Sequence, residues 1–202
     1  MIANNRNPRR HRARPASCLT GLVLFCLLLT GALQARAETD PRVRLVTTSG
    51  TIDVQLFPDK APQTVANFLR LVDDGFYDGL IFHRVIANFM IQTGGYDAAM
   101  NYREAPASVP NESFNGLRNR PGKLAMARLA DPDSADSQFF INVNHNTHLD
   151  AAPGQPGYTV FGQVVAGMDV VTDIELSDTG RQAGMAGVPE TPIVVERAKR
   201  LP

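Results

Sequence analysis

Hydrophobic and polar residues alternate along two neighbouring segments near position 50. Residues 43–47 and 51–57 follow this two-residue period, and their apolar members fall on one face. Such alternation is typical of strands that bury one side of a sheet. Between the two segments stands Ser49-Gly50, a pair suited to a tight turn. The pattern predicts an antiparallel β-hairpin at the start of a domain.

A helical period follows this hairpin. Apolar residues recur at helical spacing after Pro62, and Gly75 comes directly behind them: Val65, Phe68, Leu69 and Val72. Proline suits a first helical turn and glycine suits a helix C-terminus, so these residues predict one amphipathic helix of about three turns. A second helix is expected from Met168 to about Ile174, with apolar residues on one face.

Short apolar runs separated by Gly, Pro, Asn and Asp predict the remaining strands: residues 80–85, 89–93, 124–127, 138–143, 158–165 and 193–198. Two polar or Gly/Pro-rich stretches, residues 96–120 and 178–192, are expected as long surface loops. The pattern indicates a mainly β domain with two helices. Periodicity alone allows a sandwich or a barrel, and a barrel has the advantage of removing exposed strand edges.

The first 37 residues differ from the rest of the chain. They contain six arginines and no acidic residue, an apolar run from Leu19 to Leu33, and Ala35-Arg36-Ala37 before Glu38. This arrangement predicts a signal peptide over residues 1–37, with the functional domain over residues 38–202. The apolar run is about 15 residues, whereas an uncleaved membrane-spanning helix requires roughly 20.

The composition of the remaining domain argues against several classes of function. Of the 20 basic and 20 acidic residues in the chain, 14 and 20 lie beyond residue 37, which gives this part a net charge of −6. A net charge of −6 gives no electrostatic case for binding nucleic acid or an anionic membrane, both of which call for a basic patch. Both cysteines, Cys18 and Cys26, precede residue 38, so thiol catalysis and cysteine-ligated metals are excluded.

The sequence of this domain lacks several common catalytic and metal-binding motifs. G-x-S-x-G, H-E-x-x-H, P-loop and G-x-G-x-x-G sequences do not occur. The acidic run at residues 131–136 has Asp136 where a calcium loop needs glycine. His145 and His148 lack an obvious third ligand, so a loop pair is favoured over a metal site. We therefore expect neither a metal nor a cofactor.

The informative segments are Phe82-His83-Arg84-Val85, Asn88-Phe89-Met90-Ile91-Gln92, Met126-Ala127-Arg128 and Ser137-Gln138-Phe139-Phe140-Ile141-Asn142. Together they resemble the cyclophilin family of peptidyl-prolyl cis-trans isomerases. The resemblance extends from the first hairpin to the C-terminus. Tyr158 and the ending Ala198-Lys199-Arg200-Leu201-Pro202 are most similar to the exported cyclophilins of Gram-negative bacteria.

This resemblance implies an eight-stranded antiparallel closed β-barrel capped by two α-helices, with a peptide groove on its outer face. By motif position, Arg84 is the catalytic residue. The other implied substrate-binding residues are Phe89, Met90, Phe140 and Leu149 in the proline pocket, Gln92, Ala127 and Gln138 in the groove for the preceding peptide, and Arg128, His148 and Tyr158 around them. His83 resembles a catalytic base, but strand alternation directs it away from Arg84 and favours a structural role.

The chemistry of prolyl isomerisation suits these residues. Amide resonance opposes rotation about an X-Pro bond with a barrier of about 18–20 kcal/mol. Arginine is always charged and presents several N–H donors in one plane, so it can stabilise the twisted amide without a covalent intermediate or proton transfer. An apolar seat can hold the proline ring while the acyl side rotates. A second hypothesis is a proline-peptide-binding chaperone whose isomerase activity is incidental.

The expected partners are unfolded or flexible proline-containing polypeptides. Similarity to exported Gram-negative members implies a periplasmic location, with no membrane association after signal cleavage. His148 stands where many eukaryotic members carry tryptophan, so cyclosporin binding is expected to be weak because an indole N–H and a large apolar face are lost. We expect a monomer.

Overall fold

The strands and helices of the computed structural model agree closely with the hydrophobic pattern. The structure describes residues 1–2 and 40–202, so the predicted signal peptide lies outside the described residues except for its first two. The elements in chain order are β1 (Arg42–Thr47), β2 (Gly50–Leu56), α2 (Pro62–Asp73), β3 (Arg84–Ile86), β4 (Met90–Thr93), β5 (Lys123–Met126), η1 (Pro132–Ser134), β6 (Phe139–Asn142), η2 (Thr147–Leu149), β7 (Val160–Ala166), α3 (Met168–Glu175), β8 (Thr179–Gln182), β9 (Met185–Pro189) and β10 (Val195–Leu201).

Eight strands form one curled antiparallel sheet in the order β10-β1-β2-β7-β5-β6-β4-β3. The ladder does not run from β3 back to β10, so the description as a closed barrel is slightly too strong. Residues just before β3 cross this opening, where Gly79 N–H donates to the Val195 carbonyl at 2.8 Å and Phe82 N–H to the Ile193 carbonyl at 2.9 Å. The mainly β fold with two helices is confirmed, and the sandwich alternative is excluded.

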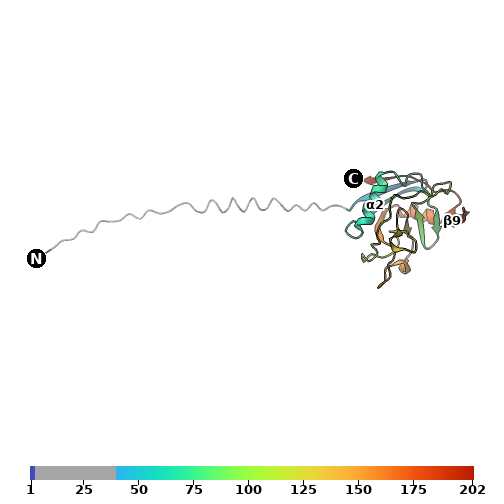
Figure 1. Cartoon of the computed structure of the whole chain (residues 1–202). Coiled ribbons are helices and arrows are strands. Elements are labelled where there is room, and N and C mark those ends of the chain that lie inside the picture. The colour runs from blue at the N-terminus through green and yellow to red at the C-terminus, as the bar shows by residue number, and fades with distance from the viewer. Residues whose placement is uncertain (3–39) are drawn as a thin grey trace. The chain divides into compact units, whose positions relative to one another are not determined.

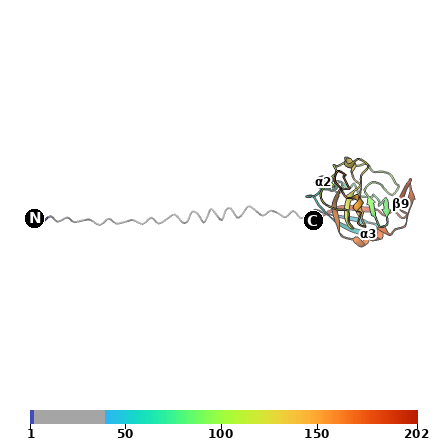
Figure 2. The same ribbon diagram turned by 90° about the horizontal axis from the view of Figure 1, so that it is seen from below.

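The concave side of the sheet is filled by apolar side chains. The inward residues of the first hairpin are fully buried: Val43, Leu45, Ile52, Val54 and Leu56. Phe68 of α2 belongs to the same core, and its ring centroid lies 5.3 Å from those of Tyr77, Phe139 and Phe161. α3 contributes the buried Val171 and Ile174. Figure 2 shows α2 and α3 on opposite sides of the folded unit.

One expected loop is instead a hairpin. Residues 178–192 contain β8 and β9, which pair as a separate two-stranded sheet. The segment lacks a clear apolar alternation. Its strand β9 packs against β3, and Val188 of β9 belongs to a small apolar cluster with Ile81 and Met100. Both views place this hairpin on the side of the folded unit away from α2 (Figures 1 and 2). The long stretch at residues 96–120 is irregular, as predicted.

The predicted limits of the first helix are confirmed. Pro62 occupies its first turn, and Gly75 follows with φ of 66°, a left-handed conformation that glycine adopts without strain. Ala61 provides no side-chain cap, but the carboxylate of Glu112 accepts hydrogen bonds from Gln63 N–H at 3.0 Å and Thr64 N–H at 2.9 Å. A distant loop therefore supplies the negative charge that stabilises this helix N-terminus. None of the described helices is long and apolar enough to cross a membrane.

Removing this cap should destabilise the domain. We expect Glu112→Ala to lower the free energy of unfolding by about 1–2 kcal/mol, because two helix N–H groups lose their acceptor. Glu104→Ala is the matched control, since Glu104 is an exposed residue of the same loop. Urea unfolding followed by circular dichroism measures both values, and equal stability of the two variants would contradict the capping role.

Candidate active site

The register of the sheet places the predicted catalytic arginine in a row with other predicted site residues. Arg84 of β3 is opposite Gln92 of β4, Gln92 is opposite Phe140 of β6, and Phe140 is opposite Ala125 of β5. Residues directly opposite in neighbouring strands share a face of the sheet. The row therefore carries the guanidinium, an amide and an aromatic ring onto the outer face.

A pocket of about 310 Å³ opens over this row. Nine side chains line it, all of them predicted site residues: Arg84, Phe89, Met90, Gln92, Ala127, Arg128, Phe140, Leu149 and Tyr158. Met90 and Phe140 are almost fully buried and form an apolar cluster separate from the main core. An apolar base with a few polar groups at the edge is suited to a small ring such as that of proline.

A chain of hydrogen bonds orients the arginine at the edge of this pocket. Arg84 Nη1 donates to Gln92 Oε1 at 3.2 Å, and Gln92 Nε2 donates to Gln138 Oε1 at 3.0 Å. Gly95 leaves room for the last of these side chains, because a Cβ there would lie 2.7 Å from Gln138 Cδ. No salt bridge involves Arg84 within residues 40–202. Its remaining N–H donors are thus not committed to a carboxylate there.

Tyr158 and Arg128 form the far wall of the pocket. The Tyr158 ring packs edge-on against Phe140, with centroids 5.8 Å apart. The Arg128 guanidinium lies 4.8 Å from the centroid of the Tyr158 ring and donates to the carbonyls of Leu129 and Pro156, both at 2.9 Å. The cation is therefore engaged with the protein itself and connects two loops that flank the groove.

Two of the predicted site residues, Gln138 and His148, do not line this first pocket. Gln138 lines an adjacent pocket, which shares Gln92, Ala127 and Arg128 with the first. His148 is exposed and lines neither pocket; its ring stacks on Phe89 with centroids 5.6 Å apart. The histidine therefore lies beside the pocket next to Arg84 and contacts it through one aromatic neighbour, Phe89.

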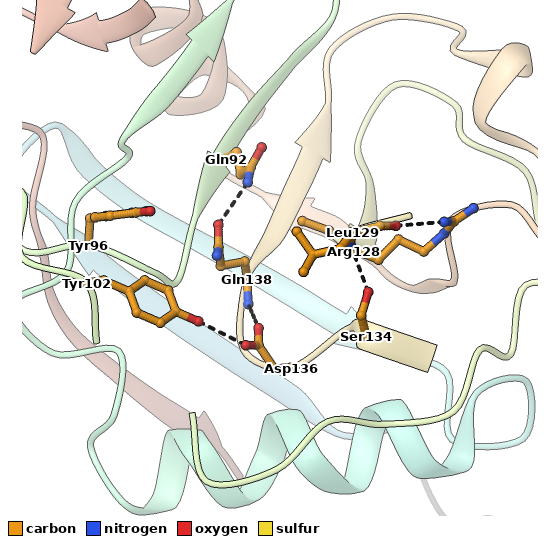
Figure 3. A pocket seen from close by; sticks show the side chains of 9 residues that line it. Gln92, Tyr96, Tyr102, Arg128, Leu129, Ser134, Asp136 and Gln138 are labelled. Carbon is orange, nitrogen blue, oxygen red and sulfur yellow. Dashed lines mark hydrogen bonds between the residues drawn. The ribbon is translucent and has the colours of Figure 1, made fainter. Parts of the chain in front are cut away.

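The adjacent pocket contains residues that the sequence did not point to. Tyr96, Tyr102, Leu129, Ser134 and Asp136 line it together with the shared residues and Gln138 (Figure 3). They come from the irregular stretch after β4 and from the loop between β5 and β6. Neither segment has a hydrophobic period, and the acidic run at residues 131–136 suggests only an incomplete calcium loop, so no signal in the sequence brought these residues together.

The comparisons with known proteins agree with this geometry. The family profile for cyclophilin type peptidyl-prolyl cis-trans isomerases matches residues 42–200. A peptidyl-prolyl cis-trans isomerase of Acinetobacter baylyi is 45% identical over 84% of this chain and 90% of its own length. Peptidyl-prolyl cis-trans isomerase A of Dickeya dadantii is 46% identical over 81% of this chain and 86% of its own length.

A solved structure shows the same fold. The crystal structure of a cyclophilin type isomerase of Cryptosporidium parvum, obtained in the presence of the dipeptide Ala-Pro, matches with a TM-score of 0.63 and 27% identity. The match covers 78% of this chain and 96% of that chain. Sheet, groove and relatives together define a prolyl-isomerase fold. The chain belongs to the cyclophilin-type peptidyl-prolyl cis-trans isomerases, and it is an enzyme of that class.

His83 lies apart from the catalytic row, as strand alternation predicted. Its side chain is 2% exposed, packs 4.9 Å from the Tyr96 ring centroid, and lines neither pocket. Its Nδ1 atom has no hydrogen-bond partner among the described residues. Burial lowers the pKa of His83 from 6.5 to about 4, because the imidazolium loses its hydration there. The imidazole is therefore neutral in the folded enzyme at neutral pH.

This buried imidazole should make stability depend on pH. Between pH 6.5 and about 4 the unfolded chain binds a proton at His83 that the folded chain does not. The free energy of unfolding is therefore highest above pH 6.5 and decreases as the pH is lowered from 6.5 to about 4. The loss amounts to roughly 3 kcal/mol at pH 4. We expect His83→Gln to flatten the profile measured by denaturant unfolding, whereas the exposed His145→Gln should follow the wild-type profile. Identical slopes in all three proteins would contradict this assignment.

Proposed function

We propose that Arg84 is the residue that accelerates X-Pro rotation and that the pocket beside it holds the proline ring. The observation that carries this proposal is the position of an arginine, oriented by Gln92, at the edge of an apolar pocket of about 310 Å³. The Cryptosporidium isomerase, which was crystallised in the presence of Ala-Pro, supports a proline ligand for this fold.

The mechanism follows from the chemistry of the amide. As the bond twists, the nitrogen becomes pyramidal and regains its lone pair, so a donor directed at that nitrogen stabilises the transition state more than the planar ground state. Arg84 supplies such a donor with a permanent charge, and Gln92 restricts its orientation. The proline ring rests on Met90 and Phe140 while the preceding residue rotates. No covalent intermediate and no proton transfer are needed.

Replacing this arginine should remove most of the rate enhancement. Loss of one preorganised donor typically lowers kcat by about 10²–10³-fold, and we expect that range for Arg84→Ala. Arg84→Lys retains the charge but loses the planar set of donors, so it should recover only part of the rate. Magnetisation-exchange NMR on an Ala-Pro peptide measures both rates. Arg118→Ala is the control, because Arg118 is an exposed arginine outside this pocket. Wild-type exchange in Arg84→Ala would refute the mechanism.

The second candidate function, a chaperone that holds proline-containing segments, depends on the same groove. Its apolar base and exposed rim would bind a segment whether or not rotation is accelerated. Suppression of client aggregation that survives Arg84→Ala would favour this function, whereas suppression lost together with exchange would favour folding assistance through isomerisation.

We also propose that the enzyme acts on exported proteins in the periplasm. The proposal rests on the sequence of residues 1–37, with its arginines, apolar run and Ala35-Arg36-Ala37. Expression in a Gram-negative host should yield a periplasmic protein that begins at Glu38. Fractionation followed by N-terminal sequencing measures this, and a cytoplasmic protein that retains residues 1–37 would contradict it. Deletion of residues 2–37 is the control and should leave the protein in the cytoplasm.

A further inference from the structure

The second pocket continues the proline groove along the sheet. Its volume is about 360 Å³, and it shares Gln92, Ala127 and Arg128 with the proline pocket. A polypeptide whose proline occupies the first pocket therefore passes the second within a few residues, at about 3.3 Å of chain for each extended residue. The side chains that line the second pocket determine which neighbouring residue fits there.

Asp136 gives this pocket a fixed negative charge. Its Oδ1 atom accepts hydrogen bonds from Ser137 N–H at 2.5 Å and Gln138 N–H at 3.4 Å, and its Oδ2 atom accepts one from the Tyr102 hydroxyl at 3.0 Å. A carboxylate has about four acceptor positions, so these three donors orient the group and leave one position on Oδ2. Desolvation and the neighbouring Asp136 charge raise the pKa of Tyr102, which keeps its phenol protonated as the donor.

The one basic residue that lines the pocket does not neutralise this carboxylate. The Arg128 guanidinium is directed away from Tyr102 and Asp136 (Figure 3) and donates to the carbonyls of Leu129 and Pro156. Within residues 40–202 no salt bridge involves Asp136. The exposed Asp133, on the same loop, adds further negative charge nearby.

The walls of the pocket suit a long side chain with a polar end. Tyr96 and Tyr102 form an aromatic pair with centroids 5.4 Å apart, and Leu129 presents an apolar side chain at the rim that is 77% exposed. An arginine or lysine side chain combines an apolar stem with a cationic head. The stem would contact Leu129, and the head would lie near the tyrosine rings and Asp136 Oδ2.

We propose that this pocket selects a cationic side chain, arginine or lysine, from the segment that precedes the isomerised proline, and that Asp136 is the residue that determines this specificity. The inference rests on the proposed function, because it places the proline in the adjacent pocket. A glutamate in the same position would meet the Asp136 carboxylate and be disfavoured, and an uncharged chain of similar length would gain only the apolar contact.

The test compares matched peptides. Arginine or norleucine is placed two or three residues before proline, and kcat/KM is measured for each peptide with the purified protein. Exposed ion pairs are individually weak, so we expect the better arginine peptide to exceed its norleucine counterpart by about threefold to fivefold. In Asp136→Asn, which keeps an oxygen acceptor for Ser137 and Gln138 but removes the charge, this ratio should fall to about one. Thermal unfolding confirms that the variant is folded.

Asp133→Asn provides the control for a general charge effect. It makes the same change in net charge on the same loop, its side chain does not line the pocket, and asparagine retains an acceptor for Asn111 N–H. This variant should keep the wild-type ratio. A wild-type ratio of one, a preference that survives Asp136→Asn, or equal loss in both variants would overturn the inference. Turnover of the norleucine peptide, together with its loss in Arg84→Ala, reports separately on the proposed function.

Discussion

The site depends on the two-residue period of strands that cover a filled interior. Phe139 lies in the aromatic cluster around Phe68, so the next residue, Phe140, must point to the outer face. The same alternation separates buried Val85 from Arg84 at the pocket. A shift of one residue in register would exchange these faces. Interior packing therefore fixes which side chains face the outer pockets, although Val85, Phe139 and Phe68 line neither of them.

The polar side chains of the site hold the Arg84 guanidinium in one orientation and keep a constant charge. The side-chain amides of Gln92 and Gln138 connect Arg84 to the neighbouring strands. Amides do not titrate and the guanidinium stays protonated, so this chain keeps one protonation state across physiological pH. The buried imidazole of His83, whose pKa is about 4, lies outside both pockets. Because this pKa lies well below neutrality, the imidazole stays neutral across the same pH range.

The two pockets differ in how the fold builds them. Residues of β3, β4 and β6 provide the base of the proline pocket, where cross-strand pairing allows little variation in geometry. The second pocket lies largely under loops: Tyr102 belongs to an irregular stretch, and Asp136 precedes β6. Loops tolerate substitution more readily than paired strands. The proposed subsite can therefore vary in its chemistry while the paired strands beside it keep their geometry.

The strands of the main sheet, both helices and the side chains that line the pocket beside Arg84 could be predicted from the sequence, because alternation, helical spacing and the Phe82-His83-Arg84 motif are local features. The sequence did not reveal the β8–β9 hairpin, which packs against β3, or the remote cap that Glu112 places on α2. The meeting of Tyr102 with Asp136, 34 residues apart, was likewise decided by tertiary structure. Contacts between irregular segments have no periodic signature, so only the folded chain could bring them together.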